Sequence, residues 1–196
     1  HFFATYDGSG NSSGVRLYIN GAAAEFAVEM DRLTESTKIT APLRIGIREP
    51  GTPAPEPMRG QVDEIRLYSR VLRPEEVREL ALAKQAGVAA NESKSLREKL
   101  VGAWSFDDVK QDKLKQEVVQ DGSGNGHHGT VEFTDQNISF EPGKFGKAVR
   151  LNNRVIQFGP ATGDFEGTEA FSYGCWVRRT DKPKQGIFSK IAQRPP

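Results

Sequence analysis

The chain has 196 residues, of which 36% are hydrophobic and 27% charged, so it falls in the globular range and allows one large domain or two small ones. Its 27 Lys and Arg residues almost balance 26 Asp and Glu residues, and the net charge of +1 gives no electrostatic reason to expect a nucleic acid or an anionic membrane as partner. No apolar run reaches the length of a membrane-spanning helix.

The first part of the chain predicts short strands and polar turns. The dipeptide Asn20-Gly21 is typical of a tight β-hairpin turn. Four prolines within residues 49–57 forbid a central strand there. Alternation of apolar residues predicts strands at 1–6, 15–19, 43–48 and 62–68, and its irregularity in the last of these indicates either a bulge or a reorienting acidic pair.

Residues 74–99 predict a helical linker. Pro74 suits a first helical position, and Glu75 and Glu76 follow it at the positive end of the helix dipole. Gly87 can end this helix, and a second short helix is expected after Asn91.

Strands resume after the linker. Residues 107–120 are charged and poor in large apolar groups, which predicts a mobile loop. The single Cys175 excludes an intrachain disulfide, and its aromatic neighbours indicate a buried structural thiol. The expected strands are 100–106, 130–133, 148–151, 155–158, 171–177 and 187–191. Short strands with Gly-rich turns predict an all-β fold, a two-sheet antiparallel sandwich or jelly roll.

Two stretches resemble halves of a known module. Residues 1–77 contain HFFATYDG, GVRLYING and GQVDEIRLYSRVLRPEEV, and they resemble the C-terminal half of a laminin-G-like, concanavalin A-like jelly roll. Residues 100–190 contain LVGAWSFDD, DGSGNGHHG, GKFGKAVRL and AFSYGCWV, and they resemble its N-terminal half. The closing pattern of the family is matched at Gly60, Val62, Asp63, Glu64, Ile65, Arg66, Leu67, Tyr68, Arg70, Leu72, Glu76 and Val77. The loops also resemble those of modules in planctomycete cytochrome-type multidomain proteins.

The order of the two halves is inverted relative to the family. We therefore divide the chain into a C-terminal half-module (1–73), a helical linker (74–99) and an N-terminal half-module (100–196). Together these parts are expected to form one compact, circularly permuted sandwich or an intertwined dimer, because each half alone buries too little surface to be stable. Unpaired strand edges make a homodimer a possible outcome.

The resemblance implies a non-catalytic recognition or adhesion module in an extracellular or periplasmic protein, with a glycan or a protein surface as ligand. One alternative is a purely structural spacer in a multidomain enzyme or redox protein, which positions neighbouring catalytic or redox domains and binds nothing itself. A second alternative is a glycoside hydrolase of the same fold. Such enzymes need carboxylates that face one cleft, whereas the pairs Asp63-Glu64 and Asp107-Asp108 are adjacent and face opposite ways, so we do not expect catalysis.

Calcium is the one cofactor that the sequence and the resemblance suggest. Asp121, Asn125 and Asp63 offer the hard oxygen donors that calcium prefers, and many laminin-G-like modules bind calcium near a loop edge. The alternative is that Asp121 only caps its own turn. The string DGSGN also occurs at residues 7–11, where we expect Asp7 to cap a turn between strands.

A glycan site would use an exposed aromatic ring. Trp104 and Trp176 lie at core-strand positions of the family, which leaves Tyr6, Tyr18 and Tyr68 as ligand-binding candidates.

Overall fold

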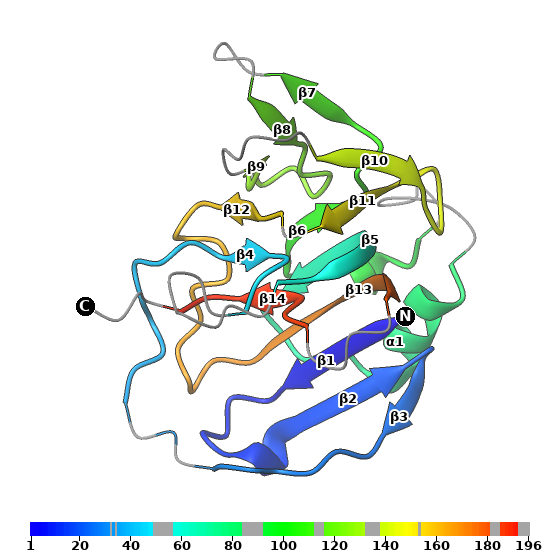
Figure 1. Cartoon of the computed structure of the whole chain (residues 1–196). Coiled ribbons are helices and arrows are strands. Elements are labelled where there is room, and N and C mark those ends of the chain that lie inside the picture. The colour runs from blue at the N-terminus through cyan, green and yellow to red at the C-terminus, as the bar shows by residue number, and fades with distance from the viewer. Residues whose placement is uncertain are drawn as a thin grey trace.

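Strand β5 (Arg59–Tyr68) is at the centre of the larger of two antiparallel sheets in the computed structural model (Figure 1). The structure describes residues 1–31, 33, 35–48, 57–83, 92–111, 116–131, 138–152, 154–180 and 185–191. The large sheet has the order β10 (Ser139–Pro142), β11 (Lys147–Asn152), β5, β13 (Phe171–Arg179), β1 (Phe2–Tyr6), β2 (Val15–Ile19) and β3 (Ala22–Ala24), and β6 (Leu100–Trp104) also pairs with β5.

The second, small sheet has six strands. Its order is β14 (Phe188–Ser189), β4 (Arg44–Ile45), β12 (Ile156–Phe158), β9 (Gly129–Val131), β8 (Glu117–Val119) and β7 (Val109–Gln111). The prediction of an all-β, two-sheet antiparallel sandwich is therefore confirmed. The prediction of a loop over residues 107–120 was wrong where β7 and β8 form. These strands lie at the outer edge of the small sheet, where little apolar surface is required.

Both edges of β5 are paired. Strand β13 lies along one edge, while β11 and β6 share the other, β11 beside residues 59–62 and β6 beside residues 65–68. The segments before and after the helical stretch thus lie in one sheet. The domain boundaries and the intertwined dimer predicted from the sequence stay predictions.

The bulge predicted in residues 62–68 is present. Glu64 has a φ of 51°, and the register against β13 shifts between Gly174 and Trp176. The extra residue resets the alternation, so that Val62 and Ile65 are both buried in the core between the sheets. The insertion explains why the sequence of this strand alternates imperfectly.

The two faces of the large sheet are covered differently. The inner face packs against the small sheet, and the outer face packs against helix α1 (Pro74–Ala81) and the short 3₁₀ helix η2 (Lys94–Arg97). The outer-face core consists of Phe3, Tyr18, Tyr68, Leu72, Val77, Leu80 and Leu96. Gly87, the expected helix end, lies outside the described residues. No helix in the described ranges is long and apolar enough to cross a membrane.

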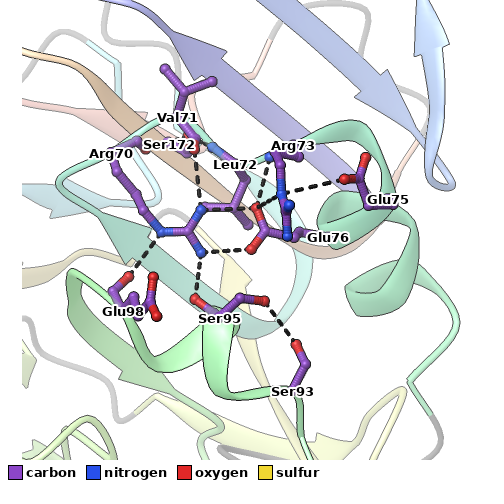
Figure 2. Close-up of polar contacts among 10 residues, drawn as sticks. All are labelled: Arg70, Val71, Leu72, Arg73, Glu75, Glu76, Ser93, Ser95, Glu98 and Ser172. Atoms are coloured by element: carbon purple, nitrogen blue, oxygen red, sulfur yellow. Dashed lines mark hydrogen bonds and ion pairs between the residues drawn. The ribbon is translucent and has the colours of Figure 1, made fainter.

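An Arg70–Glu76 ion pair fastens the helical segment to the sheet (Figure 2). The guanidinium nitrogens Nη1 and Nη2 of Arg70 lie 2.8 and 2.9 Å from the two carboxylate oxygens of Glu76. Arg70 also donates to the backbone carbonyls of Glu98 and Ser95 in the segment that leads into β6. Ser172 of β13 completes the connection, because its hydroxyl donates to the Arg70 carbonyl at 2.7 Å.

The pKa of Glu76 reflects this environment. Burial alone would raise it, but hydrogen bonds from Arg70 and from the Arg73 backbone N–H outweigh burial and lower the pKa from 4.5 to about 2. Because the folded-state pKa is depressed, the stabilisation by Glu76 is present above pH 4.5 and is lost as the pH falls toward 2.

We expect Glu76→Gln to lower the free energy of unfolding by about 2–3 kcal/mol at neutral pH, because Arg70 loses its carboxylate partner in a mostly buried site. The matched change Glu75→Gln, at a side chain that is 66% exposed, should cost less than about 0.5 kcal/mol. Urea denaturation of both variants measures the difference. Equal losses in the two variants would contradict this role for Glu76.

Candidate functional site

A cleft of about 460 Å³ opens on the inner face of the large sheet. We call it the inner-face cleft. One wall is formed by residues of β1, β2 and β13, and the opposite side by Phe165, Phe188 and neighbouring residues. Ala4 pairs with Leu17 on one side and Tyr173 on the other, so these three side chains lie on the same face of the sheet.

The cleft exists because the two sheets differ in extent. The small sheet ends at β14, which lies against β13 through a Tyr173–Phe188 ring contact of 4.9 Å between centroids. The large sheet continues past this point through β1, β2 and β3 (Figure 1). No strand of the small sheet covers these three strands within the described part of the chain, and residues of β1 and β2 border the cleft there.

Aromatic rings dominate the lining of the cleft. Phe165 stacks on Phe171 with 5.0 Å between centroids and an interplanar angle of 5°, and Tyr6 lies 5.3 Å from Phe171. Aliphatic groups from Leu17, Leu43 and Leu67 add to this surface. Such a lining offers dispersion contacts and desolvation to an apolar group.

Most polar groups at the cleft are already engaged. The Tyr6 hydroxyl donates to the Gly167 carbonyl at 2.5 Å and accepts the Gly10 N–H at 2.6 Å. The Lys190 ammonium donates to the Ala41 carbonyl at 2.9 Å and lies 3.6 Å from the Asp164 carboxylate. Burial lowers the pKa of Lys190, and Asp164 opposes this effect.

Ser189 also lines the cleft. Its hydroxyl is buried and has no hydrogen-bond partner. A buried hydroxyl without a partner carries a desolvation penalty that a ligand could remove.

A second hollow, of about 220 Å³, lies on the outer face over β11, β5 and β13. We call it the outer-face hollow. Trp176 forms part of it, with the Lys144 ammonium 4.3 Å from the ring centroid. Gln61 and Arg178 line the same hollow, and the Gln61 amide donates to Glu141 at 2.9 Å.

Asp63 is buried beneath the outer-face hollow. Its carboxylate oxygens accept the backbone N–H groups of Glu64 at 2.9 Å and Phe145 at 3.0 Å. Burial raises the pKa of Asp63 from 3.8 to about 6, and these hydrogen bonds oppose the rise. The carboxylate therefore ties the turn after β10 to the bulge in β5.

The structure does not bring the three predicted calcium ligands together. Both carboxylate oxygens of Asp121 are used within its own surroundings, by N–H groups of Ala103, Ser123 and His127 and by the Ser123 hydroxyl. Asn125 donates to the carbonyls of Leu100 and Val101, while Asp63 contacts a different turn. No cluster of three His, Cys, Asp or Glu side chains occurs within the described ranges. Calcium binding stays a prediction.

The three tyrosines lie on opposite faces of the large sheet. Tyr6 lines the inner-face cleft, whereas Tyr18 and Tyr68 are buried in the outer-face core with Val77 of α1. Burial raises the pKa of Tyr68 to about 12. Only Tyr6 is placed where it can contribute to the inner-face cleft.

From the sequence, no other residue of the cleft was a ligand-binding candidate. Phe171 and Tyr173 on β13, and Val15 and Leu17 on β2, occupy alternate positions, as residues on the buried face of a strand do. This alternation was the only signal for the cleft that the sequence offered. It could not show that the small sheet stops short of them.

Trp176 was expected at a core position but is partly exposed, because the outer face above β5 is not covered by the helix there. Cys175 is fully buried, and burial raises the pKa of its thiol to about 12.

Asp63 should give stability a measurable pH dependence. Because its folded-state pKa is raised, its contribution is largest below pH 3.8 and is lost as the pH rises through about 6. The unfolding free energy of the wild type relative to Asp63→Asn should fall by about 2 kcal/mol between pH 4 and 7. The exposed Asp108→Asn serves as control. A pH-independent difference between wild type and Asp63→Asn in urea denaturation would refute this.

Comparison with known proteins bears on the first part of the chain. Residues 1–78 match the family model of the concanavalin A-like lectin/glucanases superfamily, in its laminin G group. No curated protein and no solved structure matches the chain. The matched segment contains β1 to β5 and the start of α1. The resemblance predicted from the sequence is therefore confirmed over this segment.

Proposed function

We propose that this protein is a non-catalytic recognition module that binds a protein ligand through the inner-face cleft, in an extracellular or periplasmic setting. The observation that carries the proposal is an open cleft of about 460 Å³ lined by aromatic and aliphatic side chains. Large, mostly apolar clefts with a few polar groups are the usual form of binding sites. The family of residues 1–78 supports a binding role for carbohydrate or protein.

The lining favours apolar side chains of a protein over a sugar as the ligand. A glycan needs several hydrogen-bonding groups beside an aromatic ring, because each buried sugar hydroxyl must keep a partner. The Tyr6 hydroxyl and the Lys190 ammonium are already engaged, which leaves few hydroxyls in the lining, those of Ser189 and Tyr173 among them. Apolar side chains make no such demand.

The positions of the buried carboxylates support a non-catalytic role. The Asp63 carboxylate is occupied by backbone N–H groups, and Glu76 is held by Arg70. Neither of them lines the inner-face cleft. If the protein were only a structural spacer, it would bind no ligand, and substitutions in the cleft would change no binding.

Peptide selection tests the proposal. A phage-displayed library of random seven-residue peptides should yield apolar binders against the wild type. Leu17→Lys should weaken these binders at least tenfold, because a charge in an apolar site costs more than about 1.4 kcal/mol.

The matched control is Ile19→Lys, two residues along the same strand and outside the cleft lining, at a side chain that is 48% exposed. It should leave the binders unaffected. Selection of no peptide, or of peptides that bind Leu17→Lys equally well, would refute recognition through the inner-face cleft.

A glycan is a second candidate ligand, favoured by the outer-face hollow. There a partly exposed Trp176 ring lies beside Gln61 and Arg178, a combination of aromatic surface and hydrogen-bonding groups that suits a sugar.

Trp176→Ala should then reduce retention on polysaccharide affinity gels by about tenfold or more, since an aromatic anchor is worth more than about 1 kcal/mol. Leu17→Lys, on the other face, should have no effect on retention. Unchanged retention of Trp176→Ala, measured by affinity electrophoresis across several polysaccharides, would exclude this second candidate.

A further inference from the structure

The same chain carries an exposed segment whose chemistry matches the inner-face cleft. Residues 25–30, which follow β3, have the sequence EFAVEM and are not assigned to a helix or strand. We call them the exposed segment. Phe26, Val28 and Met30 are 41%, 51% and 73% exposed, at alternate positions. Alternate apolar residues are typical of one face of a strand.

No described residue pairs with the backbone of the exposed segment. The ladder between β2 and β3 ends at Leu17 opposite Ala24, and residues 25–30 make no hydrogen bond or ion pair to the described part of the chain. The next anchor is Asp31, whose carboxylate accepts the Ser12 N–H and hydroxyl. Several exposed apolar side chains on an unpaired stretch mark an interaction surface.

The inner-face cleft presents the complementary edge. The carbonyl of Ile187, the residue before β14, accepts the Gly46 N–H at 2.9 Å, and Phe188 of β14 lies opposite Ile45. Because successive residues of a strand direct their N–H and C=O groups to opposite sides, those of Phe188 point away from β4. No described strand lies on that side.

A strand added at this edge would lie about 4.8 Å from β14 and would cover those inner-face residues of β1 and β2 that line the cleft. Its inward side chains would meet Ala4, Leu17 and Phe171, and apolar groups at alternate positions would fill this surface. The exposed segment offers such an arrangement through Phe26, Val28 and Met30.

We infer that the partner of the inner-face cleft is a second copy of this chain, which inserts its exposed segment as an added strand beside β14. The inference rests on the proposed function, since it names the protein ligand of the same cleft. Each copy has one cleft and one exposed segment, so two copies can exchange them reciprocally and close a dimer. Two unpartnered apolar surfaces of one chain are then buried by a single contact.

Complementation between two variants tests the inference. Sedimentation velocity over a concentration series should show a dimer for the wild type. Val28→Lys, which charges the exposed segment, and Leu17→Lys, which charges the cleft, should each be monomeric. A mixture of the two should recover heterodimers, because Val28→Lys retains an intact cleft and Leu17→Lys retains an intact segment. Ile19→Lys should dimerise like the wild type.

Two further measurements report the mode of contact. A capped, fluorescein-labelled peptide with the sequence of residues 25–31 should bind Val28→Lys and should bind Leu17→Lys at least tenfold more weakly. Exchange of the Phe188 amide should slow in the dimer, while that of Ser189, which faces β4, should stay unchanged.

The outcomes separate this inference from the proposed function. A wild type that stays monomeric while its selected peptides still depend on Leu17 would overturn the second copy as partner and leave recognition through the cleft intact. Dimers that persist in both lysine variants would also overturn the inference. A monomer that selects no peptide would refute both.

Discussion

The hydrogen-bonding requirement of strand β5 constrains the rest of this structure. This strand is ten residues long and buried, so its backbone N–H and C=O groups need partners along both edges. Strand β13 fills one edge, β11 and β6 divide the other, and the bulge at Glu64 lies where the two neighbours meet. Segments from both ends of the sequence are therefore held in one sheet, and helices α1 and η2 pack on its outer face.

Buried carboxylates recur as anchors of the backbone in this fold. Glu76 holds the helical segment through Arg70, Asp63 holds the turn after β10, and Asp121 holds its own loop to β6. Each carboxylate satisfies donors that a turn or a strand end would otherwise leave unpaired. The two DGSGN strings fit the same account, since Asp7 also accepts an N–H within its turn, at 2.9 Å from Ser9. These acidic residues stabilise turns, and the structure ties none of them to the inner-face cleft.

The proposed binding role follows from a mismatch in width between the two sheets. Where the small sheet stops at β14, the large sheet still presents Ala4, Tyr6 and Leu17 on its inner face. An apolar sheet face that lacks a covering sheet is stable only when loops or another chain cover it. Loops provide part of this cover here, and the remainder is the cleft. Fold and proposed function thus have one physical origin.

The sequence by itself determined the fold class, the positions of most strands, the bulge in residues 62–68 and the start of the helix at Pro74, because each depends on local periodicity or on the chemistry of one turn. The closing pattern of the family, which includes Arg70 and Glu76, was also visible in the sequence. Only the tertiary structure decided which residues border open space. Tyr6 and Tyr18 have similar local patterns, yet one lines the inner-face cleft and the other is buried under α1. That difference depends on where the small sheet ends, and the end of a sheet is set by long-range pairing that no local stretch of residues encodes.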